Sequence, residues 1–229
     1  MPAAQTLIID GDDTLWENNI YFEQAIQDFI DFLGHSTLDR EQVRDVLDEI
    51  ERLNTGAYGY GSAAFARNLR ETYERLAERD VDTPALDHVM GLARRITQGE
   101  LQLLPGVPET LAYLSARHRL LLFTKGELEE QRLKVQGSGL EPYFDRVVIA
   151  REKDVETYSE LIREQRVVAA QGWMIGNSPR SDIQPAIAAG LGAVFIPHQH
   201  TWRLEHADLP AGNGRLLVLD SFPQLREHF

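Results

Sequence analysis

The sequence predicts an α/β fold in which a parallel sheet, covered by helices on both faces, is interrupted after its first strand by a helical segment. Two observations indicate the sheet: short, nearly continuous apolar runs recur along the chain, and helix-like segments separate the later ones. A third observation indicates the interruption, because residues 17–103 contain no convincing strand. The chain of 229 residues is long enough for a full core with a sizeable insert.

Six segments have the composition of parallel strands that are buried on both faces, and each ends in polar or glycine residues. The first ends in Leu7, Ile8 and Ile9, and the others are residues 119–126, 146–150, 172–178, 192–197 and 215–220. Four helices are expected between the later strands, at residues 106–118, 128–140, 156–165 and 182–190. The last of them begins at Asp182, an expected N-cap, and ends at Gly190.

The interrupting segment has four apolar stripes with helical spacing. They run from Tyr21 to Leu33, from Val43 to Leu53, from Phe65 to Leu76 and from Leu86 to Ile96. Four amphipathic helices can bury such stripes against one another. We therefore expect a domain like a four-helix bundle at residues 17–103, inserted into an α/β core formed by residues 1–16 and 104–229.

Glycine alternates with tyrosine in the segment TGAYGYGSAAFAR, residues 55–67, between the second and third of these stripes. Two interpretations remain open. Tyr58 and Tyr60 belong to a flexible loop that completes the core of the bundle, or they belong to a loop that closes over a site and contacts the substrate, with Arg67 as a further contact for an anion.

The net charge of −13 argues against nucleic acid or an anionic membrane as the main partner, because both are polyanions. The absence of cysteine excludes disulfides, thiolate metal sites and cysteine nucleophiles. The N-terminus lacks the pattern of a secretory signal, and no window has the apolar length to cross a bilayer. The simplest expectation is a cytoplasmic protein, and the sequence leaves its oligomeric state open.

Chemistry-bearing side chains follow the predicted strands, and in an open parallel sheet ligands bind beyond the carboxyl ends of the strands. Asp10, Asp12 and Asp13 follow the first strand, Thr124 and Lys125 close the second, and Lys153 comes after the third; Asn177 and Asp182 follow the fourth. Carboxylate oxygens suit a hard cation such as Mg²⁺, and a hydroxyl with an ammonium suits an anion. Phosphoryl transfer needs such a combination, because charge must be neutralised while the reactants are aligned.

The order of these residues resembles that of the haloacid dehalogenase-like superfamily of hydrolases. The run from Asp10 to Leu15, DGDDTL, is similar to its DxDxT motif; LLLFT, which ends at Thr124, is similar to the second motif; Lys153 matches the isolated lysine of the third; and MIGNSPRSD, residues 174–182, is similar to the fourth. The helical insert lies where this family has its C1 cap. The resemblance implies a Rossmann-like core and covers nearly the whole chain.

The resemblance implies a role for each matching residue. Asp10 would be the nucleophile, and Asp12 would be the general acid and base. Thr124 and Lys153 would hold the phosphoryl oxygens, and Thr14 would help to lock the loop. Mg²⁺ would be bound by Asp10, by the backbone carbonyl of Asp12 and by the fourth motif around Asn177 and Asp182.

The sequence departs from the family's pattern at two positions. Asn177 stands where an acid is usual, so the metal site loses a formal negative charge, although an amide oxygen still suits Mg²⁺. Lys125 stands where asparagine is common. It is expected to bind an anionic group of the substrate, or to form a salt bridge with Asp13 or Glu127 and have no chemical role.

These observations favour a Mg²⁺-dependent phosphatase that acts on a small phosphorylated metabolite through an aspartyl-phosphate. A dehalogenase would use Asp10 against carbon and would not need Asp12 as acid and base. A phosphomutase of the same superfamily is a further alternative, and so is a non-enzymatic phospho-switch or binding protein.

Overall fold

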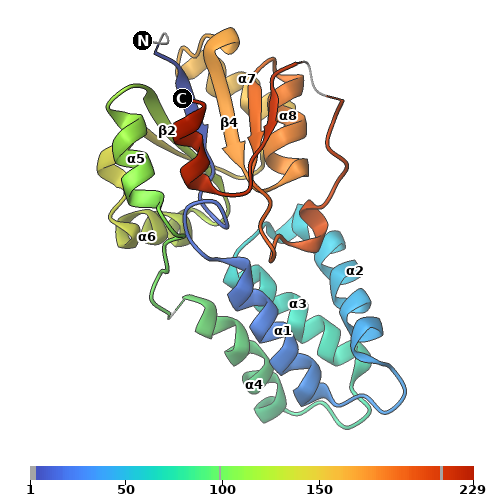
Figure 1. The fold of residues 1–229 in the computed structure, drawn as a ribbon. Helices are drawn as coiled ribbons and strands as arrows, with labels where there is room; N and C mark the ends of the chain where they lie inside the picture. The colour runs from blue at the N-terminus through green and yellow to red at the C-terminus, as the bar shows by residue number, and fades with distance from the viewer. Residues whose placement is uncertain (1–3, 98, 212–213) are drawn as a thin grey trace. The chain divides into compact units, whose positions relative to one another are not determined.

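The computed structural model describes residues 4–97, 99–211 and 214–229 (Figure 1). The chain divides into two compact units, which we call the core unit, Met1–Asn18 with Leu101–Phe229, and the helical unit, Asn19–Glu100. Hydrogen bonds between the two connecting segments keep both in the core unit. The Leu104 N–H donates to the Leu15 carbonyl (2.9 Å), and the Glu17 N–H donates to the Gln102 carbonyl (2.8 Å).

The core unit contains one six-stranded sheet in the order β3-β2-β1-β4-β5-β6. Every neighbouring pair is parallel. The strands are β1 (Thr6–Ile9), β2 (Arg119–Lys125), β3 (Arg146–Ala150), β4 (Gly172–Gly176), β5 (Gly192–Phe195) and β6 (Leu216–Val218). The order of the strands reverses between β1 and β4, where a doubly wound sheet opens a crevice at its carboxyl edge. The predicted Rossmann-like fold class is thereby confirmed.

Helices connect these strands (Figure 1). The α-helices of the core unit are α5 (Val107–Ser115), α6 (Leu128–Ser138), α7 (Val155–Glu164) and α8 (Gln184–Ala188). Short turns of other helix types are η2 (Glu141–Tyr143), η3 (Ala169–Gln171), η4 (Pro179–Ile183), η5 (Arg203–Glu205) and η6 (Phe222–Glu227). No helix in the described ranges is long and apolar enough to cross a membrane.

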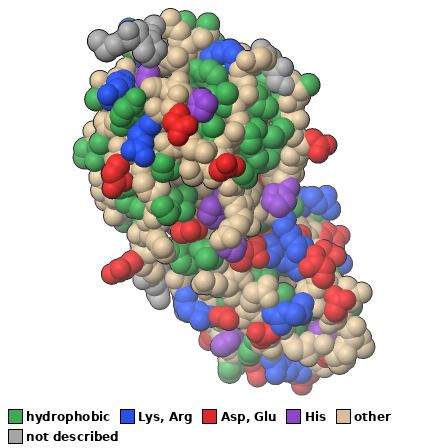
Figure 2. Space-filling view, viewed as in Figure 1, with side chains coloured by type: hydrophobic (Ala, Val, Ile, Leu, Met, Phe, Trp, Pro, Cys, Tyr) green, Lys and Arg blue, Asp and Glu red, His purple; other side chains and the backbone are tan. Residues whose placement is uncertain are grey.

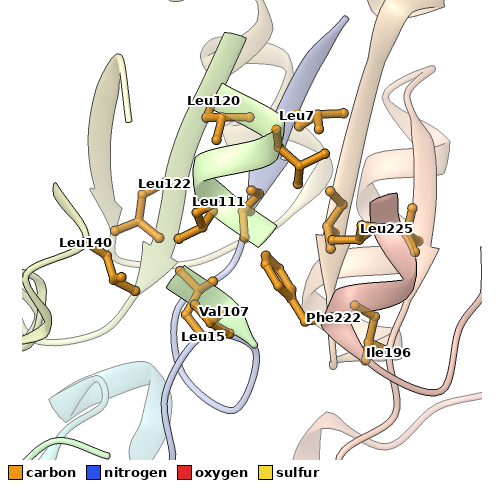
Figure 3. Close-up of a cluster of buried hydrophobic side chains, with 14 of the residues drawn as sticks. Leu7, Leu15, Val107, Leu111, Leu120, Leu122, Leu140, Ile196, Phe222 and Leu225 are labelled. Atoms are coloured by element: carbon orange, nitrogen blue, oxygen red, sulfur yellow. The ribbon is translucent and has the colours of Figure 1, made fainter. Parts of the chain in front are cut away.

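Alternate strand residues feed two separate apolar cores, as the period of two in a β-strand requires. Leu7 and Ile9 belong to the core that contains α5 and η6 (Figure 3). Ile8, between them, belongs to the other core, where it joins Tyr158 and Leu161 of α7. All three strand residues are fully buried, so the sheet is covered on both faces and offers its carboxyl edge for polar chemistry.

The segment after β4 differs from the sequence prediction. Asp182 does not cap a helix: Ser178 caps the π-helical turn η4, its side chain accepting from the Ser181 N–H, and α8 begins only at Gln184. The Asp182 carboxylate reaches back to accept from the Ser178 N–H (2.9 Å). Serine and aspartate are both good helix caps, so the sequence alone does not decide between them. The π-helical turn begins after Ser178, and Asp182 therefore lies within this turn and not at its cap.

The helical unit contains α1 (Asn19–Leu33), α2 (Arg40–Tyr58), α3 (Ser62–Leu76), α4 (Thr83–Arg94) and the 3₁₀ turn η1 (Arg95–Thr97). Their predicted stripes meet in one apolar cluster that includes Phe29, Leu47, Leu69 and Val89. Leu53 is an exception: its side chain is exposed, so its assignment to this core was wrong. Acidic and basic side chains are interspersed over the visible face of this unit (Figure 2).

The segment 55–67 is mostly helical, and the predicted flexible loop is limited to a short link. The helix α2 continues to Tyr58, and α3 begins at Ser62. Only residues 59–61 link them, and both glycines of this link, Gly59 and Gly61, have positive φ (72° and 102°). Arg67 lies over the Tyr58 ring (4.9 Å), so its guanidinium has a partner within its own unit.

A buried ion pair ties α1 to α2 in the helical unit. The Arg44 guanidinium donates to both carboxylate oxygens of Glu23 (2.6 and 2.8 Å) and to Asp48 (2.7 Å). Burial opposes the charge of Arg44, but the hydrogen bonds that it donates to the two acids outweigh burial and raise the pKa of Arg44 above its usual value. Arg44→Met is expected to lower the free energy of unfolding by about 1–3 kcal/mol, because hydrogen bonds to charged groups are among the stronger ones.

Urea unfolding followed by circular dichroism measures this effect. The exposed pair Arg75–Glu49 supplies a matched control, since Arg75→Met is expected to cost less than about 1 kcal/mol. Equal losses in the two variants would contradict a stabilising role for the buried pair. The fluorescence of Trp16, Trp173 and Trp202, which all lie in the core unit, reports separately on that unit.

Candidate functional site

A tight turn after β1 places the first motif at the carboxyl edge of the sheet. The Asp10 N–H donates to the Ile175 carbonyl of β4 (2.9 Å), and the Leu15 N–H donates back to the Gly11 carbonyl (2.8 Å). A β-carbon at Gly11 would overlap the Trp16 ring, so close packing explains this glycine. The positive φ of the turn falls on Asp13 (59°).

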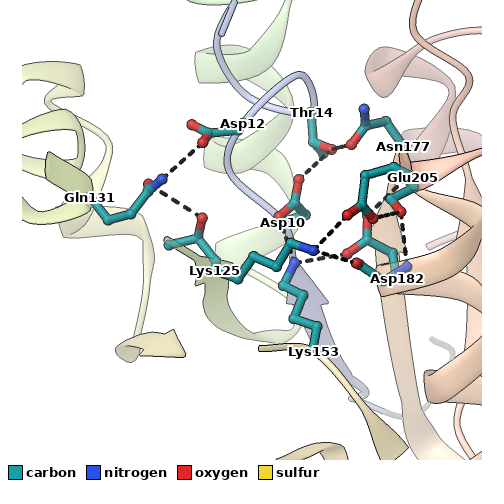
Figure 4. Close-up of polar contacts among 12 residues, drawn as sticks. Asp10, Asp12, Thr14, Lys125, Gln131, Lys153, Asn177, Asp182 and Glu205 are labelled. Carbon is teal, nitrogen blue, oxygen red and sulfur yellow. Dashed lines mark hydrogen bonds and ion pairs between the residues drawn. The ribbon is translucent and has the colours of Figure 1, made fainter. Parts of the chain in front are cut away.

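A buried cluster of one ammonium and two carboxylates lies at the centre of this edge (Figure 4). The Lys153 Nζ lies 2.6 Å from Asp10 Oδ1 and 2.8 Å from Asp182 Oδ1. All three side chains are nearly inaccessible to solvent. The cluster therefore has two acids for one base, in surroundings where charge is poorly screened.

Burial has opposite effects on the acid and the base of this cluster. Burial raises the pKa of Asp10 to about 7, Lys153 opposes that shift, and the nearby Asp182 adds to it. Burial alone would lower the pKa of Lys153, but Asp10 and Asp182 outweigh it and raise that pKa above its usual value. Ionisation of Asp10 therefore costs free energy in the folded protein, and an additional positive charge nearby would reduce that cost.

The fourth motif approaches the first through hydroxyl groups. The Thr14 Oγ1 donates to Asp10 Oδ2 (3.0 Å) and also lies 3.4 Å from Asn177 Oδ1. The Asn177 amide nitrogen donates to Thr201 Oγ1 (3.0 Å), which directs the amide oxygen toward Thr14. A β-carbon at Gly176 would overlap the Asp182 carboxyl group, so this glycine makes room for the acid.

Asp12 faces α6, away from the buried cluster (Figure 4). Its carboxylate accepts from Trp16 Nε1 (2.6 Å), from Gln131 Nε2 (2.8 Å) and from Lys134 Nζ (2.9 Å to each oxygen). Thr124, which is buried at the end of β2, donates its hydroxyl to Gln131 Oε1 (3.3 Å). One glutamine side chain therefore connects the second motif to the first.

Lys125 forms a salt bridge, but with other acids than the sequence suggests. Its Nζ lies 2.6 Å from Glu205 Oε1 and 3.3 Å from Glu152 Oε1, and it also donates to Ser181 Oγ (2.8 Å). Neither Asp13 nor Glu127 is its partner in these ion pairs. Burial would raise the pKa of Glu205, but Lys125 and two serine hydroxyls hold it below its usual value. Lys125 therefore neutralises a buried acid next to the site.

Asp13 lies outside the Asp10 cluster and is buried beside the loop that follows β5. Its Oδ1 accepts from the Asn18 N–H (2.9 Å) and lies 3.7 Å from His198 Nδ1. His198 also approaches Glu17, with 3.3 Å between Nε2 and Oε2. Burial lowers the pKa of His198, which favours its neutral form. This second cluster connects the loop to the segment that leaves the core unit.

Most of the predicted site residues meet in the core unit: Asp10, Asp12, Thr124, Lys125, Lys153, Asn177 and Asp182. Tyr58 and Tyr60 belong to the helical unit, and their contact with a substrate stays a prediction. Sequence reasoning missed Gln131, Lys134 and Glu205. A signal existed for the first two, because polar residues three positions apart in a predicted helix share one face. We find none for Glu205, since its partner Lys125 lies 80 residues away.

The doubly wound parallel sheet with paired acids at its carboxyl edge places this chain among the Rossmann-like α/β proteins. Comparison with known proteins identifies the family. Residues 4–190 match the haloacid dehalogenase-like hydrolase family, so the chain belongs to it. Phosphoserine phosphatase of Thermus thermophilus is 28% identical over 186 residues, which cover 77% of this chain and 70% of that protein.

Two solved structures extend the comparison. A haloacid dehalogenase-like family hydrolase from Xanthomonas campestris is 28% identical, with a TM-score of 0.84 over 99% of this chain and 94% of that chain. A HAD-family hydrolase from Bacillus subtilis, bound to magnesium, is 16% identical, with a TM-score of 0.70 over 99% of this chain and 98% of that one. At that identity, the second likeness shows the fold alone.

Proposed function

We propose that this hydrolase is a Mg²⁺-dependent phosphatase that acts on a small phosphorylated metabolite through an aspartyl-phosphate on Asp10. The observation that carries the proposal is the pairing of two different carboxylates at the end of β1. Asp10 lies in the buried Lys153 cluster, and Asp12, two residues on, lies in a separate, partly exposed network. Cleavage of a phosphate ester needs a nucleophile and a proton donor, and these two acids suit those roles.

The donor set fits the metal. Asp10, Asn177 and Asp182 offer oxygen atoms around the Thr14 hydroxyl and the Lys153 ammonium, and Mg²⁺ prefers oxygen ligands. With both acids ionised, the buried cluster has one more negative than positive charge. Burial raises the pKa of Asp10, so a bound cation would favour its ionised form. With the backbone carbonyl of Asp12, these three side chains would hold Mg²⁺, which neutralises charge on the phosphoryl group when bound.

The first step joins Asp10 to phosphorus. A carboxylate oxygen of Asp10 attacks the phosphorus atom in line while the bond from phosphorus to the ester oxygen breaks. Asp12 gives its proton to that departing oxygen. Thr124 and Lys153 donate hydrogen bonds to the phosphoryl oxygens and offset the charge that develops on them.

The second step releases phosphate. Asp12, now ionised, takes a proton from a water molecule whose oxygen attacks the same phosphorus atom. The bond from phosphorus to Asp10 breaks and regenerates both carboxyl groups. We assign residues 17–103 the role of a cap that selects the substrate, with Tyr58 and Tyr60 as contacts for the leaving group.

Phosphate release in the presence and absence of Mg²⁺ tests the proposal. The purified protein is expected to hydrolyse p-nitrophenyl phosphate with Mg²⁺, and removal of the metal with EDTA is expected to lower the rate by at least about 100-fold. A panel of small phosphate esters that includes phosphoserine then identifies the substrate class. Release of halide from a 2-haloacid, without phosphate release from any ester, would establish a dehalogenase instead.

A further inference from the structure

Two side chains of α6 approach the predicted acid and base from a helix that carries none of the four motifs. Gln131 is almost completely buried, and its amide has two partners: Nε2 donates to Asp12 Oδ2 (2.8 Å), and Oε1 accepts from Thr124 Oγ1 (3.3 Å). Lys134, one turn further on, places its Nζ 2.9 Å from both oxygens of Asp12 and 2.7 Å from Asn18 Oδ1.

The segment before α6 is shaped to admit the glutamine. Gly126 has a φ of 149°, and a β-carbon there would lie 2.8 Å from Gln131 Nε2. The helix then begins after Glu127, whose carboxylate caps it by accepting from the Glu130 N–H (2.8 Å). A side chain at residue 126 would thus displace the amide, so the turn and the glutamine depend on each other.

These contacts determine how the Asp12 carboxylate is oriented. Three donors surround it, since Trp16 Nε1 also donates to Oδ1 (2.6 Å). A carboxylate has about four acceptor positions, so three directed donors leave little freedom to rotate. Gln131 lies on the side of Asp12 away from Asp10 (Figure 4).

We propose that Gln131 and Lys134 are positioning residues that orient Asp12 for proton transfer, and that Gln131 couples this orientation to the Thr124 hydroxyl. The inference rests on the proposed phosphatase function, in which Asp12 protonates the departing oxygen. Proton transfer depends steeply on the distance and alignment of donor and acceptor. Loss of either side chain therefore impairs esters whose leaving group needs a proton and spares esters whose leaving group does not.

Two substrates separate these effects in the full-length protein with Mg²⁺. p-Nitrophenolate departs without a proton, whereas the alkoxide of an alkyl phosphate needs one. The value of kcat/KM covers the steps up to departure of the leaving group, so hydrolysis of the shared aspartyl-phosphate does not enter the comparison. We expect Gln131→Met and Lys134→Met each to lower kcat/KM for the alkyl ester by about 10- to 100-fold, and for p-nitrophenyl phosphate by less than about threefold.

Three further variants complete the test. Asp12→Asn is expected to lower kcat/KM for the alkyl ester selectively, and by a larger factor than either methionine variant. Lys134→Arg is expected to retain most of the activity that Lys134→Met loses. Arg132→Met removes an exposed cation from the same helix. Among the ion pairs of the described residues, Arg132 pairs only with Glu129. This variant is expected to leave kcat/KM unchanged for both substrates. Lys134 is partly exposed, so its variants fold even if the buried Gln131→Met does not.

The outcomes distinguish the inference from the function on which it rests. Selective loss on the alkyl ester, with rescue by arginine, supports the positioning role. Equal losses on both esters in Gln131→Met and Lys134→Met overturn that role alone, provided that Asp12→Asn remains selective. A protein that hydrolyses neither ester, or an Asp12→Asn variant without selective loss, overturns the proposed role of Asp12 itself.

Discussion

Asp10→Asn is expected to lower kcat for any phosphate ester by at least about 10⁴-fold, while the variant is more stable than the parent protein at pH 8. The loss of activity follows because an amide oxygen cannot form the aspartyl-phosphate. The gain in stability follows from the charges around Lys153, which has two buried acids as partners in the parent. The variant leaves Lys153 paired one to one with Asp182.

The sign of the pH dependence follows from the raised pKa. Asp10 takes up a proton at about pH 7 in the folded protein and at about 3.8 in the unfolded chain. Between these values the folded state binds more protons, so its stability falls as the pH rises and stays low above pH 7. Asparagine does not titrate, so the advantage of the variant is expected to be on the order of a few kcal/mol at pH 8 and smaller at pH 5.

Thermal unfolding of the metal-free protein at the two pH values measures this difference. Addition of Mg²⁺ is expected to raise the Tm of the parent more than that of Asp10→Asn, because a ligand stabilises the state that binds it. Asp13→Asn is the matched control, since it removes the neighbouring carboxylate outside the Lys153 cluster, and it is expected to retain turnover. An inactive Asp10→Asn variant whose stability follows the parent at every pH would contradict the electrostatic argument.

The sequence predicts the sheet well because buried parallel strands have a strong local signature. β3, for example, has the predicted bounds, residues 146–150. The helix after β4 is predicted less well, since Ser178 and Asp182 are both good caps and only the π-turn decides between them. The exposed Leu53 shows a similar limit, because helical spacing identifies a stripe but not where neighbouring helices stop covering it.

The predictability of the site residues also depends on whether their signal is local in the sequence or comes from residues far apart in the chain. Asp10, Thr124, Lys153 and Asp182 are predictable because each lies in a short pattern close to the end of a strand. The pairing of Lys125 with Glu205 is not predictable, because a charge pairs with whichever acid the fold brings near, and Glu205 lies in η5, 80 residues further along the chain. Gln131 shares a helix face with Lys134, but a polar residue in a helix usually faces solvent, so this pattern alone does not reveal that Gln131 is buried.

Lys153→Met is expected to destabilise the protein by about 3–5 kcal/mol at pH 8, the largest effect on stability that we predict. Methionine keeps an apolar chain against the Phe123 ring, over which Lys153 Nζ lies at 5.2 Å, so the change mainly removes charge. Asp10 and Asp182 then face each other, buried and without their ammonium partner. Removal of a positive charge also raises the pKa of Asp10 further.

The pH dependence of the stability of Lys153→Met distinguishes the effect of the lost charge from that of lost packing. Because the folded-state pKa of Asp10 lies still higher in Lys153→Met, this carboxyl group is neutral at pH 5.5, and the deficit relative to the parent shrinks there. A packing defect would be equal at both pH values. The double variant Asp10→Asn/Lys153→Met removes one stranded carboxylate and is expected to be more stable at pH 8 than Lys153→Met alone.

Urea unfolding of the four proteins, namely the parent, both single variants and the double variant, gives the coupling between the two residues directly. Activity has a different expected pattern, because the proposed mechanism has Asp10 and Lys153 act on the same phosphoryl group. Lys153→Met is expected to lower kcat/KM by at least about 100-fold, and the double variant recovers none of it even as it recovers stability. In the proposed mechanism the buried lysine would thus have two separable effects: it stabilises two buried acids in the fold, and it allows one of them to act as a nucleophile.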